Sequence, residues 1–332
     1  MVDISVIIVN WNTRQLLLDC IASVYGTVHK AAFEIFVVDN GSTDGSVRSV
    51  ADKYPDVTII ANTRNEGFAQ ANNAAIRRMV GEYAVLLNSD TVLKEHALDR
   101  MLAFMKKHPR AGMCGPQLLF RDGSQQTSTG AFPELLSELT SASMVRLLTS
   151  GKRRKHKLVF DGPTPVDFII GACMFVRKAA IDSAGMLDED YFFFYEEIDW
   201  CYRLNKAGWL IYHLPDIEIF HFGGQATKNI NQRARVESWR SRYIYFKKTL
   251  DLHGMKAKAL VVMGFTQTTL KFSGYLIMNL LSLFMLPRLR RRWLMFANLF
   301  VWHVRGLPIS MGLPRQSSAK FEKERVGATR SL

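Results

Sequence analysis

The chain has 332 residues, of which 48% are hydrophobic and 22% charged, and its formal net charge is +13. Such a composition can bury a substantial core, which excludes a disordered tail or a fibre and favours an enzyme with one large domain and an appendage. Its four cysteines, Cys20, Cys114, Cys173 and Cys201, form no Cys-x-x-Cys pair. This spacing argues against a disulfide framework or a zinc cluster and suits a reducing compartment.

The first residues enter a strand pattern almost at once, without the basic start and apolar stretch of a secretory signal, so we expect a cytoplasmic protein. Short apolar runs then alternate with helical patterns, an order that predicts βαβ units and a mainly parallel sheet. Strands are predicted near residues 4–9, 34–39, 57–61 and 83–88. Apolar stripes predict helices over residues 16–24 and 98–105, and Ser42 or Asp44 could cap another helix that runs toward Lys53.

The pattern changes after Pro116. A hairpin is predicted around the Asp122-Gly123 turn, where we expect the parallel winding to end. Residues 132–165 read as a loop whose basic run, 152–157, is either a lid or membrane contact or a solvated charge run. Further on, an ordered stretch is predicted over 166–176, a helix over 195–207 and strand-like pieces over 209–213 and 217–221.

Charge divides the chain unevenly. Residues 1–227 carry 23 Lys and Arg against 26 Asp and Glu, whereas residues 228–332 carry 20 against 4. The second part also holds the most apolar stretch, 272–286, which is shorter than the roughly 20 residues of a bilayer span unless it joins 259–270 across Lys271. Cationic flanks around an apolar body indicate a helical appendage docked on an anionic membrane surface; a core helix pair with a solvated basic face is the alternative. No nucleic-acid recognition motif accompanies the basic residues, so nucleic acid is not expected as a partner.

Carboxylates follow two of the predicted strands, at the edge where parallel sheets bind nucleotides. Asp39 could accept a hydrogen bond from the ring N–H of a uracil or thymine, or could only cap the next helix. Asp90 ends Asn88-Ser89-Asp90 and is the first-choice ligand for Mg²⁺ or Mn²⁺, although this tripeptide is also an ordinary turn. His221 precedes two glycines at another strand end and could supply a second ligand, or could be structural.

Three acids, Glu196, Glu197 and Asp199, open the helix predicted near residue 195 and follow a run of aromatic residues. One of them could act as the base that takes the proton of an acceptor hydroxyl, with a pKa raised by its apolar surroundings. Helical spacing puts Glu196 and Asp199 on one face and turns Glu197 about 100° away. The alternative is electrostatic capping of the helix.

Seven short segments, in this order along residues 1–225, resemble the family-2 glycosyltransferases of the GT-A fold, and most closely their bacterial rhamnosyltransferase-like branch. They are Val6–Asn12, Val38–Gly45, Asn65–Asn73, Leu87–Asp90, Gly171–Met174, Phe194–Asp199 and His221–Gly224.

The resemblance implies a Rossmann-like α/β domain of the GT-A type over residues 1–227, followed by the helical basic region 228–332. It implies an inverting transferase with a divalent cation, Mg²⁺ or Mn²⁺, and a nucleotide-sugar donor, for which dTDP-L-rhamnose is favoured. The basic tail adds the expectation of a glycan acceptor, lipid-linked, in cell-surface polysaccharide synthesis on the inner face of the plasma membrane. Three alternatives stay open: another UDP- or dTDP-sugar, a catalytically decayed nucleotide-binding or scaffold protein, and a nucleotidyltransferase, whose glycine-rich loop is replaced here by Asn10-Trp11-Asn12.

By the family pattern, Asp39 meets the base, Asp90 and His221 hold the metal or diphosphate, and Glu197 aligns with the catalytic base, with Glu196 and Asp199 in contention. Two positions depart from that pattern: Asn88 stands where the metal motif begins with aspartate, and Glu197 stands where relatives often have aspartate. The residues expected near the donor are Val9, Asn10, Asn12, Asp39, Asn40, Ser42, Arg64, Asn65, Gly67, Phe68, Asn72, Asn88 and Ser89.

Overall fold

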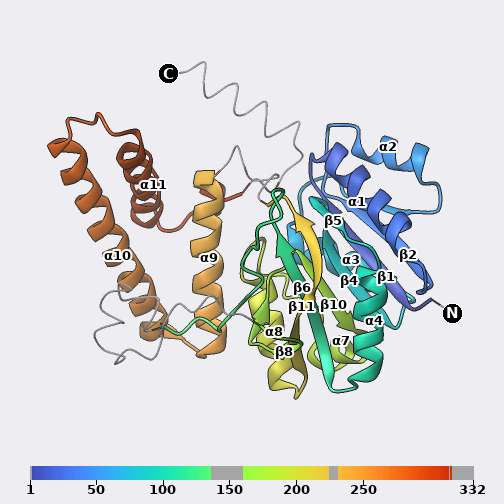
Figure 1. Ribbon diagram of the computed structural model, residues 1–332. Coiled ribbons are helices and arrows are strands. Elements are labelled where there is room, and N and C mark those ends of the chain that lie inside the picture. Colours follow the sequence, from blue (N-terminus) through green and yellow to red (C-terminus); the bar gives the residue numbers. More distant parts are fainter. Residues whose placement is uncertain (1, 136–159, 224–230, 314, 316–332) are drawn as a thin grey trace. The chain divides into compact units, whose positions relative to one another are not determined.

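The computed structural model describes residues 2–135, 160–223, 231–313 and 315, so the basic run at 152–157 lies outside the described residues. The described residues divide into two compact units (Figure 1). One is formed by residues 2–132 and 160–223, and the other by residues 133–135 and 231–313. Each unit is described by itself.

The first unit is an α/β domain, as predicted. Its elements are β1 (Ile4–Asn10), α1 (Arg14–Thr27), β2 (Phe33–Asp39), α2 (Ser46–Lys53), β3 (Thr58–Ala61), α3 (Phe68–Ile76), β4 (Tyr83–Asn88), β5 (Thr91–Leu93), α4 (Ala97–Lys107), β6 (Ala111–Leu119), β7 (Thr129–Gly130), β8 (Thr164–Pro165), β9 (Phe168–Ile169), β10 (Cys173–Arg177), α7 (Lys178–Ala184), α8 (Glu196–Lys206) and β11 (Leu210–His221). The main sheet has the strand order β3-β2-β1-β4-β10-β6-β11-β5, with β8 beside β11. Strands β1 to β4 pair in parallel, whereas β10 is antiparallel to both of its neighbours.

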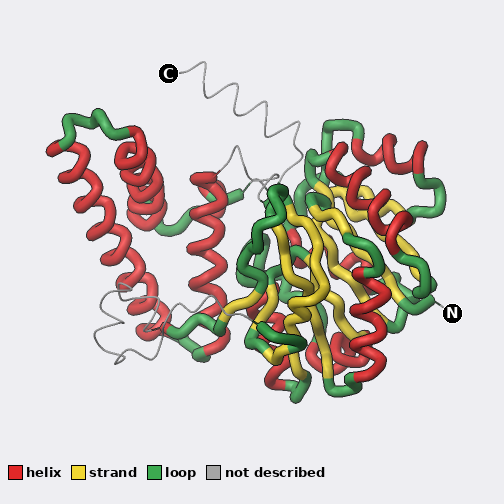
Figure 2. The backbone as a smooth tube through the Cα atoms, in the orientation of Figure 1, coloured by secondary structure: helices red, strands yellow, loops and turns green. Residues whose placement is uncertain are grey.

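Alternating side chains place a core on each face of this sheet. In β1, Val6 and Ile8 belong to one core and Ile7 to the other, as the two-residue period of a strand requires. Helices α1, α2 and α4 contribute to the first core, and α3, α7 and α8 to the second. The sheet is therefore covered by helices on both faces (Figure 2), the arrangement in which parallel strands are usually found.

Two expectations for the second half of the sheet were wrong. Parallel pairing does not end at Pro116, because β6 runs through this residue to Leu119 and pairs in parallel with β11. Pro116 lies beyond the residues that β6 pairs with β10, so its missing N–H breaks no hydrogen bond of that ladder. The two pieces predicted over 209–221 form one strand, β11, with a register shift between Leu214 and Glu218.

The Asp122-Gly123 turn is present, with Gly123 at φ +81° and a bridge between Leu119 and Gln125.

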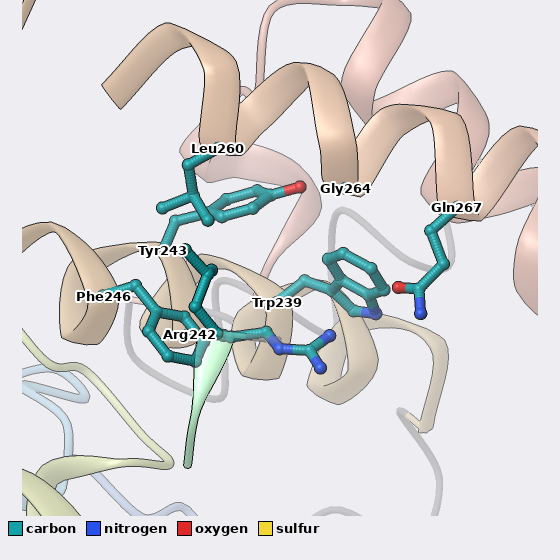
Figure 3. A pocket seen from close by; sticks show the side chains of 8 residues that line it. Trp239, Arg242, Tyr243, Phe246, Leu260, Gly264 and Gln267 are labelled. Atoms are coloured by element: carbon teal, nitrogen blue, oxygen red, sulfur yellow. The ribbon is translucent and has the colours of Figure 1, made fainter. Parts of the chain in front are cut away.

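The second unit consists of α9 (Asn231–Thr249), α10 (Gly254–Leu281), α11 (Pro287–Val304) and a short 3₁₀ turn (Ile309–Met311). A small core of Val236, Trp239, Phe296, Leu299 and Trp302 joins α9 to α11. Figure 3 shows a small pocket of this unit, in which Trp239, Arg242, Tyr243 and Phe246 of α9 face Leu260, Gly264 and Gln267 of α10.

The apolar stretch predicted over 272–286 is not one segment. Helix α10 runs through Lys271 and ends at Leu281, and Pro287 then begins α11 at the helix position that proline favours. Across the described part of the chain, no helix combines the length and apolarity that a bilayer crossing requires.

Candidate active site at the carboxyl edge of the sheet

Three parallel strands end side by side with the side chains that the sequence singled out. Asn10 of β1 pairs with Asp39 of β2, and Val9 pairs with Asn88 of β4. Because parallel strands share one carboxyl edge, the loops that follow β1, β2 and β4 meet there. Glu197 of α8 lies beside Gly171, and the next residue, Ala172, binds Asn88 at this edge.

Asp39 is 2% exposed and its carboxylate is held from two sides. Asn10 Nδ2 donates to its Oδ1 at 2.8 Å, and the backbone N–H of Ser42 donates to its Oδ2 at 2.8 Å. Ser42 Oγ in turn accepts from the backbone N–H of Asn12 at 2.8 Å. Asp44, by contrast, accepts from the N–H of Ser46 at the start of α2. Capping of α2 therefore belongs to Asp44, and Asp39 fixes the loop that follows β2.

The same network reaches the loop after β4. Thr13 Oγ1 donates to Asn10 Oδ1 at 2.7 Å and lies 2.9 Å from Ser89 Oγ. Thr13 was not among the predicted site residues. A hydroxyl one turn past a strand end gives no distinctive sequence signal, although here it links the Asp39 loop to the Asn88-Ser89-Asp90 loop.

The segment from Arg64 to Asn72 packs against the Asp39 loop. Asn40 Nδ2 donates to the carbonyl of Gly67 at 3.1 Å, and Asn65 Oδ1 accepts from the N–H of Gly67 at 3.0 Å. Gly67 has φ +86°, and a Cβ there would lie 2.5 Å from the carbonyl oxygen of Phe192. The N–H of Phe68 donates to that same Phe192 oxygen at 2.8 Å. Only glycine fits this junction between residues 64–72 and the loop that precedes α8.

Two side chains of this segment face other partners. Arg64 is exposed and pairs with Glu66 at 2.7 Å, with its backbone against Gly41. Asn72 is buried, and its Nδ2 donates to the carbonyl of Phe68 at 2.9 Å. Its Oδ1 is buried without a hydrogen-bond partner among the described residues. Buried polar atoms without a hydrogen-bond partner are uncommon in folded proteins.

Asp90 and His221 come together although 130 positions separate them in the chain. His221 pairs with Thr91 across β11 and β5, and the N–H of Phe222 donates to the carbonyl of Asp90 at 2.9 Å. Asp90 Oδ1 then lies 3.4 Å from His221 Nε2, with 11% and 13% of the two side chains exposed.

Gln126 fixes the imidazole of His221. Its Nε2 donates to the carbonyls of His221 and Leu119, at 2.5 Å and 3.2 Å, and its Oε1 faces His221 Nδ1 at 3.1 Å. An amide oxygen only accepts, so its place beside Nδ1 suits the tautomer with the proton on Nδ1, in which the Nε2 lone pair can bind a ligand. A carboxylate and an imidazole side by side are donor groups that fit a divalent cation. Sequence reasoning missed Gln126, because its role depends on a contact with a strand 95 positions away.

The three acids of α8 have different surroundings. Phe194 and Tyr195 precede them with φ +70° and +71°, a left-handed backbone uncommon for bulky residues and typical of functional loops. Asp199 accepts from Arg203 Nε at 2.7 Å, within the same helix, and is 3% exposed. This pairing is that of a structural carboxylate. Glu196 is also buried, at 4% exposure.

Glu197 is half-buried at the start of α8. Burial raises its pKa to about 7, although hydrogen bonds from backbone N–H groups at the start of α8 act in the opposite direction. Its Oε2 is buried without a hydrogen-bond partner among the described residues. A Cβ placed on Gly171 would lie 3.6–3.8 Å from the Glu197 side chain, and the neighbouring Ala172 accepts from the N–H of Asn88 at 2.9 Å. Residues 171 and 172 therefore connect the surroundings of Glu197 to the end of β4 at Asn88.

Another cluster of metal-type ligands occurs in the described residues. His29, Glu95 and His96 place one donor atom each within 4.8 Å of one another. His29 precedes β2, at the opposite end of that strand from Asp39, and it and Glu95 are exposed. This cluster lies apart from the carboxyl edge and is not assigned to the site.

The fold has known counterparts among solved glycosyltransferases. The mannosyltransferase PcManGT from Pyrobaculum calidifontis, in complex with GDP-Man and Mn²⁺, matches with a TM-score of 0.53 at 17% identity, over 92% of this chain and 86% of that chain. GalNAc-T7 with UDP, GalNAc and Mn²⁺ also matches with a TM-score of 0.53 at 17% identity, over 75% of this chain and 51% of that chain. The architecture is thus that of the GT-A glycosyltransferases.

The family follows from the sequence comparison. A model described as glycosyl transferase family 2 matches residues 5–185, more than half of the chain, and the chain belongs to this family. An N-acetylglucosaminyl-diphospho-decaprenol L-rhamnosyltransferase of Mycobacterium tuberculosis is 28% identical over 226 residues, 64% of this chain and 73% of the relative. The rhamnosyltransferase WbbL of Escherichia coli is 25% identical, over 55% of this chain and 70% of the relative. A hexosyltransferase, Agl10 of Haloferax volcanii, is 25% identical over 84% of this chain and 85% of the relative.

Proposed function

We propose that this glycosyltransferase moves L-rhamnose from dTDP-L-rhamnose to a hydroxyl of a lipid-linked glycan, with inversion at the anomeric carbon. The donor and the acceptor class rest on the printed activities of the rhamnosyltransferase relatives. The observation that carries the chemistry is Glu197, a carboxyl group of raised pKa beside the strand edge that holds Asp39 and Asp90.

In this mechanism Asp39 accepts from the ring N–H of thymine, while Asn40 and the Arg64–Asn72 segment line the donor. Asp90 and His221 would hold a divalent cation, which when bound offsets the negative charge of the diphosphate. Glu197 takes the proton of the acceptor hydroxyl as its oxygen attacks the anomeric carbon. The bond from that carbon to the phosphate oxygen breaks on the opposite face, and its electron pair leaves with dTDP.

We further propose that the reaction serves cell-surface polysaccharide synthesis, with the chain bound peripherally at the cytoplasmic face of the plasma membrane. A polyprenyl-linked acceptor keeps its reacting sugar at a membrane surface, and residues 228–332 supply an excess of positive charge for anionic lipids.

The test is a donor screen with purified full chain, Mn²⁺ and a lipid-linked N-acetylglucosaminyl diphosphate acceptor. We expect product with dTDP-L-rhamnose and inverted stereochemistry by NMR. Turnover with UDP-sugars alone would show that the donor is not dTDP-L-rhamnose, while the protein would still be a glycosyltransferase. Nucleotide binding without turnover of any sugar would instead indicate a decayed transferase that acts as a binding or scaffold protein.

A further inference from the structure

One face of α10 is exposed along the whole helix and carries no charged residue. Its positions recur every three or four residues, which places them on one side of a helix. They are Met255, Ala259, Val262, Thr266, Leu270, Ser273, Ile277 and Leu281, all exposed, and we name this set the α10 stripe. Met255, Leu270 and Leu281 are 85%, 69% and 82% exposed. Isolated exposed apolar residues are normal, but a continuous uncharged stripe of this length marks an interaction surface.

The stripe continues into the turn between α10 and α11. Leu283, Met285 and Leu286 are 79%, 77% and 52% exposed. Leu283 and Phe284 have φ values of +50° and +57°, so this turn holds bulky apolar residues in a backbone conformation that normally selects glycine or asparagine. We name residues 283–286 the apolar tip.

The opposite side of α10 already has its partners inside the unit. Leu260, Gly264, Thr268 and Asn279 are buried there, and α10 packs along α11. The α10 stripe is therefore not needed to complete the core of the unit. Moving its apolar side chains out of water and against a further partner would be favourable in free energy.

The positive charges at both ends of the stripe favour an anionic partner. Residues 252–321 contain no Asp or Glu, whereas exposed cations stand beside both ends of the stripe: Lys256 and Lys258 at the start of α10, and Arg288, Arg290, Arg291 and Arg292 after the tip. Lys271 of α10 is exposed as well, and partial burial together with the positive charges of Arg242 and Arg235 lowers its pKa. A second copy of this surface would bring like charges together, whereas anionic headgroups would neutralise them.

We propose that the α10 stripe and the apolar tip lie in the interface of an anionic bilayer, with the apolar side chains among the acyl chains and the arginines at the headgroup phosphates. A helix that exposes an apolar face between cationic flanks can bind in this way without crossing the bilayer. The inference sharpens the proposed peripheral membrane association by naming the contact surface, and it does not depend on which sugar is transferred.

The experiment is vesicle flotation of the full chain, with phosphatidylcholine alone and with phosphatidylcholine mixed with phosphatidylglycerol. Gln replaces Leu at positions 270 and 281, since it keeps helix propensity and removes apolarity without adding charge. We expect wild type to bind the mixed vesicles and the double variant to bind at least roughly tenfold more weakly. Val80→Gln is the matched control, because Val80 is 66% exposed in the α/β domain, and it should bind like wild type.

A second arm tests the charge. Replacing Arg290 and Arg291 with Gln should weaken binding to the mixed vesicles by about fivefold per arginine, with a smaller dependence on salt. All substituted side chains are exposed, so circular dichroism melts should match wild type; if the Leu variant melts early, Leu281→Ser alone replaces it.

Three results would overturn the proposal. The first is equal binding by wild type and the double variant. The second is no binding of wild type to the mixed vesicles. The third is a dimer, detected by light scattering, that the Leu variant separates while vesicle binding is absent, which would make the stripe an interface between copies. Because flotation requires no turnover, an inactive chain that still floats would separate failure of the proposed function from failure of this inference.

Discussion

Glu197 and Asp199 stand two positions apart in α8 and have opposite surroundings. Asp199 is neutralised by Arg203, whereas Glu197 has a buried oxygen without a described partner and a pKa raised to about 7. A carboxyl group that titrates near neutral pH can take and release a proton under working conditions. The sequence could name the three acids but could not separate Asp199 from the other two, because that distinction depends on its pair with Arg203.

Replacing Glu197 with Gln should lower kcat by roughly 10²–10⁴-fold while the affinity for dTDP stays within a few fold. In wild type the rate should rise with pH up to about 7, where Glu197 ionises, and then level off. Steady-state rates across pH and calorimetry with dTDP test both statements. Near-normal turnover of Glu197→Gln would refute the assignment. Asp199→Asn is the control, and it should lower Tm while keeping the pH profile.

The same pKa predicts a pH dependence of stability. The folded-state pKa of Glu197 lies above the ordinary value of 4.5, so the unfolded chain releases this proton first. Between about pH 4.5 and 7, wild type should lose about 3 kcal/mol of unfolding free energy relative to Glu197→Gln, and the difference should stay constant above that range. Urea unfolding of both proteins at several pH values measures it. Parallel stability curves would show that the group titrates normally.

Gln126 should control the affinity of the cation site. Gln126→Leu removes the acceptor that faces His221 Nδ1, so the imidazole can rotate or change tautomer, and Mn²⁺ affinity should fall about 10–100-fold. Gln126→Glu keeps an acceptor at that place and should retain affinity within a few fold. Electron paramagnetic resonance titration of free Mn²⁺ measures both without turnover. Unchanged affinity in Gln126→Leu would remove Gln126 from the site.

At the scale of elements, β1 to β4 could be predicted because they are buried apolar runs with parallel neighbours on the same sheet. Strand β5 has only three residues, and β6 contains Gly112, Gly115 and Pro116, so neither shows a strand pattern. Both were therefore missed. The division of β11 into two pieces has the same origin, since Pro215 and Asp216 interrupt its alternation at the register shift.

A substitution at Gly67 tests the contact between residues 64–72 and the loop before α8. Ala at this position combines a left-handed backbone with a Cβ placed 2.5 Å from Phe192, so Gly67→Ala should cost about 2–4 kcal/mol and weaken dTDP binding. Gly123 has a similar φ of +81° with nothing within 4 Å of a Cβ. Gly123→Ala should therefore cost only about 1–2 kcal/mol. If chemical unfolding shows that both variants lose the same unfolding free energy, the contact with Phe192 does not contribute to the cost at Gly67.

At the scale of the molecule, the chain places its acidic and its basic parts in separate regions of sequence. The residues assigned to donor, cation and proton transfer all belong to the α/β domain. This could be predicted from the motifs, because strand ends meet at one edge of a parallel sheet. The contact between Asp90 and His221 could not, since it depends on the antiparallel pairing of β5 with β11.

Cation and nucleotide should therefore stabilise the whole chain through Asp90. Mn²⁺ with dTDP at about 100 times the dissociation constant should raise the unfolding free energy by about 2.7 kcal/mol, and EDTA should reverse the part that is due to the cation. Differential scanning fluorimetry should show this shift in wild type and in the Leu270, Leu281 double variant. Asp90→Asn should lose the part of the shift that EDTA reverses, and an unchanged shift in that variant would show that the cation binds elsewhere.

Two main-chain hydrogen bonds join the first half of the α/β domain to its later loops. The N–H of Phe68 donates to the carbonyl of Phe192, and the N–H of Asn88 donates to the carbonyl of Ala172. Main-chain donors and acceptors persist whatever side chains occupy those positions. The side chains of residues 186–195 can therefore change by mutation without breaking these main-chain hydrogen bonds. This range lies beyond the family match, which ends at residue 185. Where this loop is attached is thereby separated from which chemical groups it displays.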